Sequence, residues 1–124
     1  MTDLLAQLNR DIWKPFAAAY GALDAGALMD LAMVADRGDR IGIEFRFHER
    51  IAAGDLASER GLFGLSVVPA EGEPRERYGR FHTVARRVDG RWRFAVDYDT
   101  VGGADAAAFG AAAAVDDLAR FAPA

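Results

Sequence analysis

The sequence contains no cysteine and only two histidines. The lack of cysteine excludes disulfide bonds, thiolate nucleophiles and thiolate zinc sites. The two histidines, His48 and His82, do not have the spacing of metal ligands. We therefore expect no metal and no cofactor.

A basic stripe and a long apolar run are also missing. The 15 basic residues are interspersed among 19 acidic ones, for a net charge of −4, which predicts no nucleic-acid partner. No apolar run approaches the roughly 20 residues that cross a bilayer, and the first residues lack the features of a leader peptide. These patterns predict no membrane partner and a cytoplasmic location, and the excess of arginine and alanine over lysine indicates a bacterial gene.

The residues that are present describe a globular chain, with 52% hydrophobic and 27% charged residues. A length of 124 residues suits one domain of ordinary size. We expect a single α+β domain over residues 1–124. It would comprise helices in 1–35, an antiparallel meander in 40–101 and a C-terminal helix in 104–122.

The first 23 residues have apolar side chains at every third or fourth position, as one helix face requires. They are Leu5, Leu8, Ile12, Phe16, Tyr20 and Leu23. Pro15 predicts a kink, or a break at which it opens a second segment. Asp24 then suits the N-cap of a further helix that reaches Leu31.

From Ile41 the apolar period changes to two, which predicts strands. Turns at 53–55 and at Asp89-Gly90 separate strands over 57–68, 77–88 and 91–101. These make a curved antiparallel sheet of about four strands. After Asp105, small and apolar side chains at helical spacing predict the C-terminal helix.

A two-residue turn at Asp89-Gly90 predicts which side chains of the second hairpin lie opposite one another. His82 would face Asp97, and Arg80 would face Asp99, on the polar side. The His82–Asp97 pair could orient and charge an imidazole for acid–base work. It could equally be an ordinary stabilising pair of opposite charges.

The first hairpin allows two registers. A three-residue turn packs the apolar side chains best and places Glu49 opposite Glu59, where two carboxylates would raise one pKa and make a general acid or base. A two-residue turn instead pairs Glu49 with Arg60 and Arg50 with Glu59 as salt bridges. A β-bulge could reconcile the two registers.

Aromatic side chains on the helix and strands are candidates for the wall of a ligand pocket, although aromatics at such spacing also make plain core. The candidates are Trp13, Phe16, Tyr20, Phe45, Phe63, Phe81, Trp92 and Tyr98. The catalytic candidates are Glu49, Glu59, His82 and Asp97.

Four segments together resemble a known family. They are Trp13-Lys14-Pro15-Phe16 with Tyr20, Leu23 to Leu28, Tyr78 to Val84, and Asp89-Gly90-Arg91-Trp92-Arg93. Over residues 12–101 the chain is similar to the SnoaL-like branch of the nuclear-transport-factor-2-like superfamily, which has the cystatin-like cone fold. The resemblance implies a curved sheet wrapped around helices, an apolar pocket and usually a homodimer. The short segment 32–39, where members often carry another strand and helix, implies an open or shallow pocket.

The resemblance does not select a function, because members include cyclases, isomerases, hydrolases, dehydratases and transport adaptors. One hypothesis is a domain that binds a small apolar molecule, with acid–base catalysis of the isomerase, cyclase or hydratase type. In that hypothesis Glu49, Glu59 or Asp97 acts as acid or base and Tyr20 or Tyr98 as hydrogen-bond donor. The alternative is a noncatalytic homodimeric interaction or regulatory domain that pairs through the sheet.

Overall fold

The structure is a computed structural model that describes residues 2–22, 40–68 and 72–122. The predicted helix from Asp24 to Leu31 lies outside the described residues. The side chain of Tyr20 lies outside them as well.

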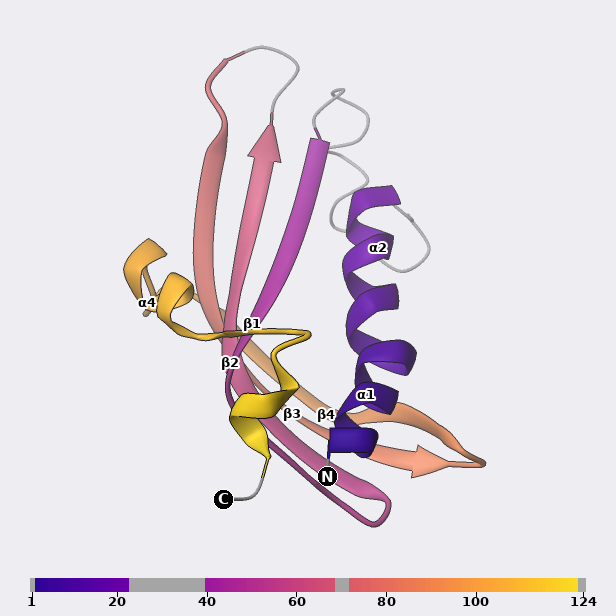
Figure 1. Ribbon diagram of the computed structural model, residues 1–124. Helices are drawn as coiled ribbons and strands as arrows, with labels where there is room; N and C mark the ends of the chain where they lie inside the picture. Colours follow the sequence, from indigo (N-terminus) through magenta and orange to yellow (C-terminus); the bar gives the residue numbers. More distant parts are fainter. Residues whose placement is uncertain (1, 23–39, 69–71, 123–124) are drawn as a thin grey trace.

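One curved antiparallel sheet forms the body of the molecule (Figure 1). Its long strands are β1 (Arg40–Ala53), β2 (Leu56–Val68), β3 (Arg75–Val88) and β4 (Arg91–Val101). The short strand β5 (Ala113–Ala114) pairs with β1, so the order across the sheet is β4-β3-β2-β1-β5. The predicted α+β class with a curved meander is confirmed, with β5 as an addition.

An N-terminal helix runs along one side of this sheet (Figure 1). It comprises α1 (Thr2–Leu8), a π-helical segment η1 (Asn9–Trp13) and α2 (Lys14–Ala22). The wide turn ends just before Pro15, with the Lys14 N–H donating to the Asn9 carbonyl. Because a proline ring crowds the carbonyl four residues before it, the helix accommodates Pro15 by widening there.

The side of the sheet that carries this helix is the helix face, and the opposite side is the outer face. The helix buries Leu5, Leu8, Ile12 and Trp13. Trp13 lies at the centre of the core, with ring centroids of Phe45, Phe47, Phe81 and Phe94 at 4.9, 5.0, 5.0 and 5.6 Å. Such aromatic contacts stabilise a core beyond the apolar area that they bury.

The prediction of one C-terminal helix over 104–122 is wrong. Asp105 does cap a helix, accepting from the Ala108 N–H at 2.8 Å, but α4 (Ala106–Ala111) ends after six residues. The chain then extends so that Ala113 and Ala114 pair with Phe47 and Arg46 of β1, and a 3-10 turn, η3 (Leu118–Phe121), follows. Pairing at the sheet edge thus overrides the helical propensity of alanine.

The β1–β2 hairpin and the β3–β4 hairpin each contain one bulge. In the first, the turn at Gly54-Asp55 gives the two-residue register as far as Glu49↔Arg60, and His48 is the extra residue. Beyond His48 the pairing follows the other predicted register, with Phe45↔Phe63 and Ile43↔Leu65. The prediction that a bulge reconciles the two registers is confirmed, and Glu49 does not lie opposite Glu59.

The second hairpin begins as predicted, with Val88 opposite Arg91 and Asp89 at a positive φ of 52°. Ala95 is an extra residue, however, so that Val84 pairs with Val96 and every later residue of β4 changes face. The predicted pairs His82–Asp97 and Arg80–Asp99 are therefore wrong. His82 faces Tyr98 and Asp97 faces Thr83.

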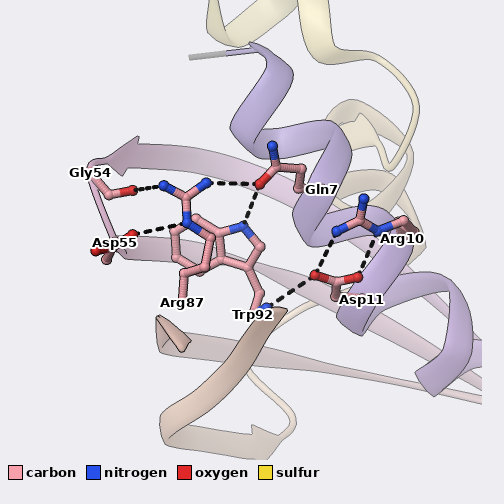
Figure 2. A network of polar contacts seen from close by, with 7 residues as sticks. All are labelled: Gln7, Arg10, Asp11, Gly54, Asp55, Arg87 and Trp92. Carbon is pink, nitrogen blue, oxygen red and sulfur yellow. Dashed lines mark hydrogen bonds and ion pairs between the residues drawn. The ribbon is translucent and has the colours of Figure 1, made fainter. Parts of the chain in front are cut away.

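A polar network ties the helix to the ends of both hairpins (Figure 2). Gln7 Oε1 accepts from the indole Nε1 of Trp92 at 3.3 Å and from the guanidinium of Arg87 at 3.0 Å. Arg87 also donates to Asp55 at 2.9 Å, and Asp11 accepts from the Trp92 backbone N–H at 3.0 Å. These contacts fix the angle between helix and sheet, and so they fix the space between the two layers.

Candidate functional site

A cavity of about 160 Å³ lies between the N-terminal helix and the sheet. Trp13 and Phe16 contribute from the helix, and all four long strands contribute the rest of the lining. The strand residues are Ile43, Phe45, Phe63, Leu65, Phe81, Thr83, Phe94, Asp97, Asp99 and Val101. The lining is thus mostly aromatic and aliphatic, as in sites for small organic ligands.

Two carboxylates, Asp97 and Asp99, lie on the lining of this apolar cavity. They are two residues apart on β4, so their side chains leave the strand on the same face, about 7 Å apart along it. They reach the helix face because Ala95 shifts the register, which places Asp97 opposite Thr83 and Asp99 opposite Phe81. Without the bulge both would lie on the outer face.

The negative charges of Asp97 and Asp99 have no positive charge beside them on the cavity lining among the described residues. Asp97 and Asp99 are both exposed residues, but partial burial of the Asp97 carboxyl group raises its pKa, and the charge of Asp99 raises it further. The lining contains no basic side chain among the residues that the structure describes. A proton or a cation in the cavity would relieve this repulsion.

Thr83 provides a hydroxyl group beside the acidic pair. The residue is 1% exposed, and its Oγ1 has no hydrogen-bond partner within the described part of the chain. An unpaired buried hydroxyl is costly. A ligand with a hydrogen-bonding group could supply the missing partner of this hydroxyl.

Glu59, a predicted catalytic candidate, lies deeper than the cavity in a buried ion pair. Its carboxylate accepts from Arg50 Nε at 2.6 Å and from the indole Nε1 of Trp13 at 3.1 Å. Arg50 completes its bonds with Asn9 Oδ1 at 2.6 Å and with the Val115 carbonyl at 3.1 Å. Burial raises the pKa of Glu59, whereas Arg50 and the Trp13 N–H lower it.

This buried network positions the cavity wall. The bulge at His48 brings Arg50 onto the helix face, where its side chain is 0% exposed and its guanidinium lies 4.1 Å from the Phe47 ring centre. Glu59 holds the Trp13 indole by one edge while the ring packs against the cavity aromatics. Glu59 thus fixes the position of Trp13 and does not line the cavity itself.

The structure places two other catalytic candidates away from the cavity. Glu49 forms an exposed ion pair with Arg60 at 3.3 Å. His82 is exposed on the outer face, where its Nε2 lies 3.0 Å from Ser58 Oγ. Only Asp97 among the four candidates lines the cavity.

Some of the predicted pocket residues line the cavity and others lie away from it. Trp13, Phe16, Phe45, Phe63 and Phe81 line the cavity. Two others lie elsewhere: Tyr98 is 67% exposed on the outer face, and Trp92 is a core residue that lines a separate hollow against Pro15 and Ala19. The register shift at Ala95 accounts for Tyr98.

The sequence interpretation missed Asp99, Thr83 and Phe94 as lining residues. The sequence did contain a signal for Asp99. Asp97 and Asp99 are two residues apart on one strand, so whichever face of the sheet holds Asp97 also holds Asp99. Locating the bulge itself needed the structure. Among the described residues, no group of three or more metal-ligating side chains gathers at this or any other place.

Comparisons with protein-family models find no match to this chain. A search of curated proteins finds none either. In the described part of the chain, no helix has the length and apolar character to cross a membrane.

Proposed function

We propose that this protein binds a small, largely apolar molecule in the cavity beneath its N-terminal helix. The observation that carries the proposal is the placement of two carboxylates and an unpartnered hydroxyl on an otherwise apolar lining. Asp97 and Asp99 are exposed, but the buried Thr83 hydroxyl lacks a partner within the described residues, and burying such a group costs stability. Proteins accept such costs at functional sites.

The acidic pair gives the site a capacity for proton transfer. Partial burial and the neighbouring charge raise the pKa of Asp97, and a carboxyl group with a raised pKa is better suited to proton exchange than an ordinary aspartate. The chemistry that fits is proton transfer on an apolar substrate, of the isomerase, cyclase or hydratase type.

The arrangement of the elements also supports a proposed membership in the nuclear-transport-factor-2-like superfamily. A meander of four long strands curves around an N-terminal helix (Figure 1), as that resemblance implies.

A matched pair of blocking variants tests the binding function. Val101 and Val96 are on the same strand and are 62% and 57% exposed, but Val101 lines the cavity and Val96 lies on the outer face. V101W should remove the binding of small apolar compounds in ligand-detected NMR, whereas V96W should retain it. Equal binding to both variants would contradict the proposal.

A second candidate function is pairing of two copies through the outer face. Val96 and Tyr98 are exposed there beside Arg80 and His82, and exposed apolar side chains rimmed by polar ones are typical of interfaces. Light scattering of wild type and Y98R tests it. A dimer that Y98R converts to a monomer would support this function, and a monomeric wild type would exclude it.

A further inference from the structure

We propose that the ligand of this cavity is an organic cation, a compact apolar molecule with one protonated amine that Asp97 and Asp99 hold. This inference rests on the proposed binding function and names the ligand class. Three independent features of the described lining support it: its charge, its aromatic surface and its size.

The charge of the lining selects the sign of the ligand. Asp97 and Asp99 are its only ionisable side chains within the described residues, and each lacks an ion pair there. An anionic ligand would meet two like charges. An ammonium group placed between them would donate charge-assisted hydrogen bonds to both carboxylates and leave the Thr83 hydroxyl within reach of the same end.

The aromatic surface distinguishes an organic cation from a metal ion. The rings of Trp13, Phe45 and Phe81 form a contiguous group, with centroids 4.9 to 5.8 Å apart. Ring faces attract ammonium cations and pack against hydrocarbon. A calcium ion takes about six to eight oxygen ligands, more than two carboxylates and a hydroxyl provide, and aromatic rings offer it none.

The size of the cavity limits the apolar part of the ligand. Its volume is about 160 Å³, and an apolar cavity of roughly 150 Å³ holds a single benzene ring. A one-ring amine therefore fits, with its ring against the aromatics and its amine at the β4 side.

Three probes of nearly equal shape separate the contributions of charge and apolar surface. Benzylamine, benzyl alcohol and benzoate can be titrated into the protein at neutral pH and low salt, with calorimetry for affinity and the Trp13 indole N–H resonance for location. We expect benzylamine to bind at least about tenfold more tightly than benzyl alcohol, as charge-assisted hydrogen bonds allow. Benzoate should bind most weakly.

Variants of the same shape test whether the two carboxylates are responsible. In D97N/D99N the preference for benzylamine should fall to within about twofold while benzyl alcohol binding is kept. E73Q is the control for charge, because Glu73 is exposed and away from the cavity. It should leave the preference unchanged.

The outcomes distinguish the two proposals. If benzyl alcohol or benzoate binds as tightly as benzylamine and shifts the Trp13 resonance, the cavity binds ligands but the cation inference is overturned. If D97N/D99N keeps the amine preference, the inference is overturned as well. If none of the three probes shifts the Trp13 resonance, the binding function fails and the inference fails with it. The wild-type comparison does not depend on the folding of any variant.

Discussion

Asp97 is the residue at which the proposed function and the stability of the fold oppose each other most directly. Its carboxylate lies on an apolar cavity beside Asp99, and both circumstances raise its pKa. A carboxyl group with a raised folded pKa favours the native state below its unfolded pKa, and this contribution disappears as the pH rises through the folded pKa. At neutral pH the ionised group therefore destabilises the fold.

We predict that D97N is more stable than the wild type at pH 7. The gain should be less than about 1 kcal/mol, because Asp97 is exposed and solvent screens its charge. It should shrink as the pH falls toward about 4, the unfolded pKa of an aspartate, where the wild type is protonated as well. Urea unfolding at several pH values measures this difference, and a gain that is constant with pH would contradict the assignment of its cause.

At the scale of the elements, most of the strands could be predicted from the sequence, and the turns at Gly54-Asp55 and Asp89-Gly90 fixed the ends of both hairpins. For the strand residues beyond each bulge, the sequence predicted less well which side of the sheet they occupy. His48 and Ala95 are ordinary strand residues with no glycine or proline beside them, so local preference does not mark a bulge there. Each bulge is selected by packing, since it puts Arg50 or the Asp97–Asp99 pair on the helix face.

Gly79 shows why β3 lacks a side chain at one place on the helix face. A Cβ built there would lie 2.2 Å from the Phe63 ring and 2.5 Å from the Thr100 carbonyl oxygen. We predict that G79A displaces the Phe63 ring, lowers the stability by about 1 to 3 kcal/mol and disturbs the cavity.

Gly110 provides a control at which the same substitution should not lower the stability. It lies in α4, and a Cβ there would meet nothing within 4 Å. G110A should therefore be neutral or stabilising by up to about 1 kcal/mol, since alanine favours helix. Thermal unfolding of both variants tests the pair, and equal effects would show that the space around Gly79 does not matter.

At the scale of the whole molecule, the buried Arg50–Glu59 pair joins four parts of the chain. Asn9 and Trp13 come from the helix, Arg50 from β1, Glu59 from β2 and the Val115 carbonyl from the C-terminal segment. Beyond the bond that joins them, Arg50 and Glu59 thus bond to the N-terminal helix and to the C-terminal segment, both distant in sequence. Sequence reasoning found the pairing but not its burial, because burial depends on the His48 bulge and on the C-terminal segment leaving its helix.

We predict that E59Q lowers the stability by about 3 to 5 kcal/mol, because it leaves Arg50 as an uncompensated buried charge. E49Q is the matched control on the neighbouring pair. The Glu49–Arg60 pair is exposed, so its loss should cost less than about 1 kcal/mol. Chemical denaturation measures both, and similar costs for the two variants would contradict the structural role of Glu59.

The single extra residue at Ala95 decides which chemistry the interior presents. Removing it would exchange the two sides of the strand beyond it, so that Val96 and Tyr98 would lie on the helix face and both aspartates on the outer face. Deletion of one codon could thus convert an acidic cavity lining into an apolar one in a single step, a change that no point substitution achieves. Descendants of this chain could in this way acquire a new specificity through a gain or loss of length.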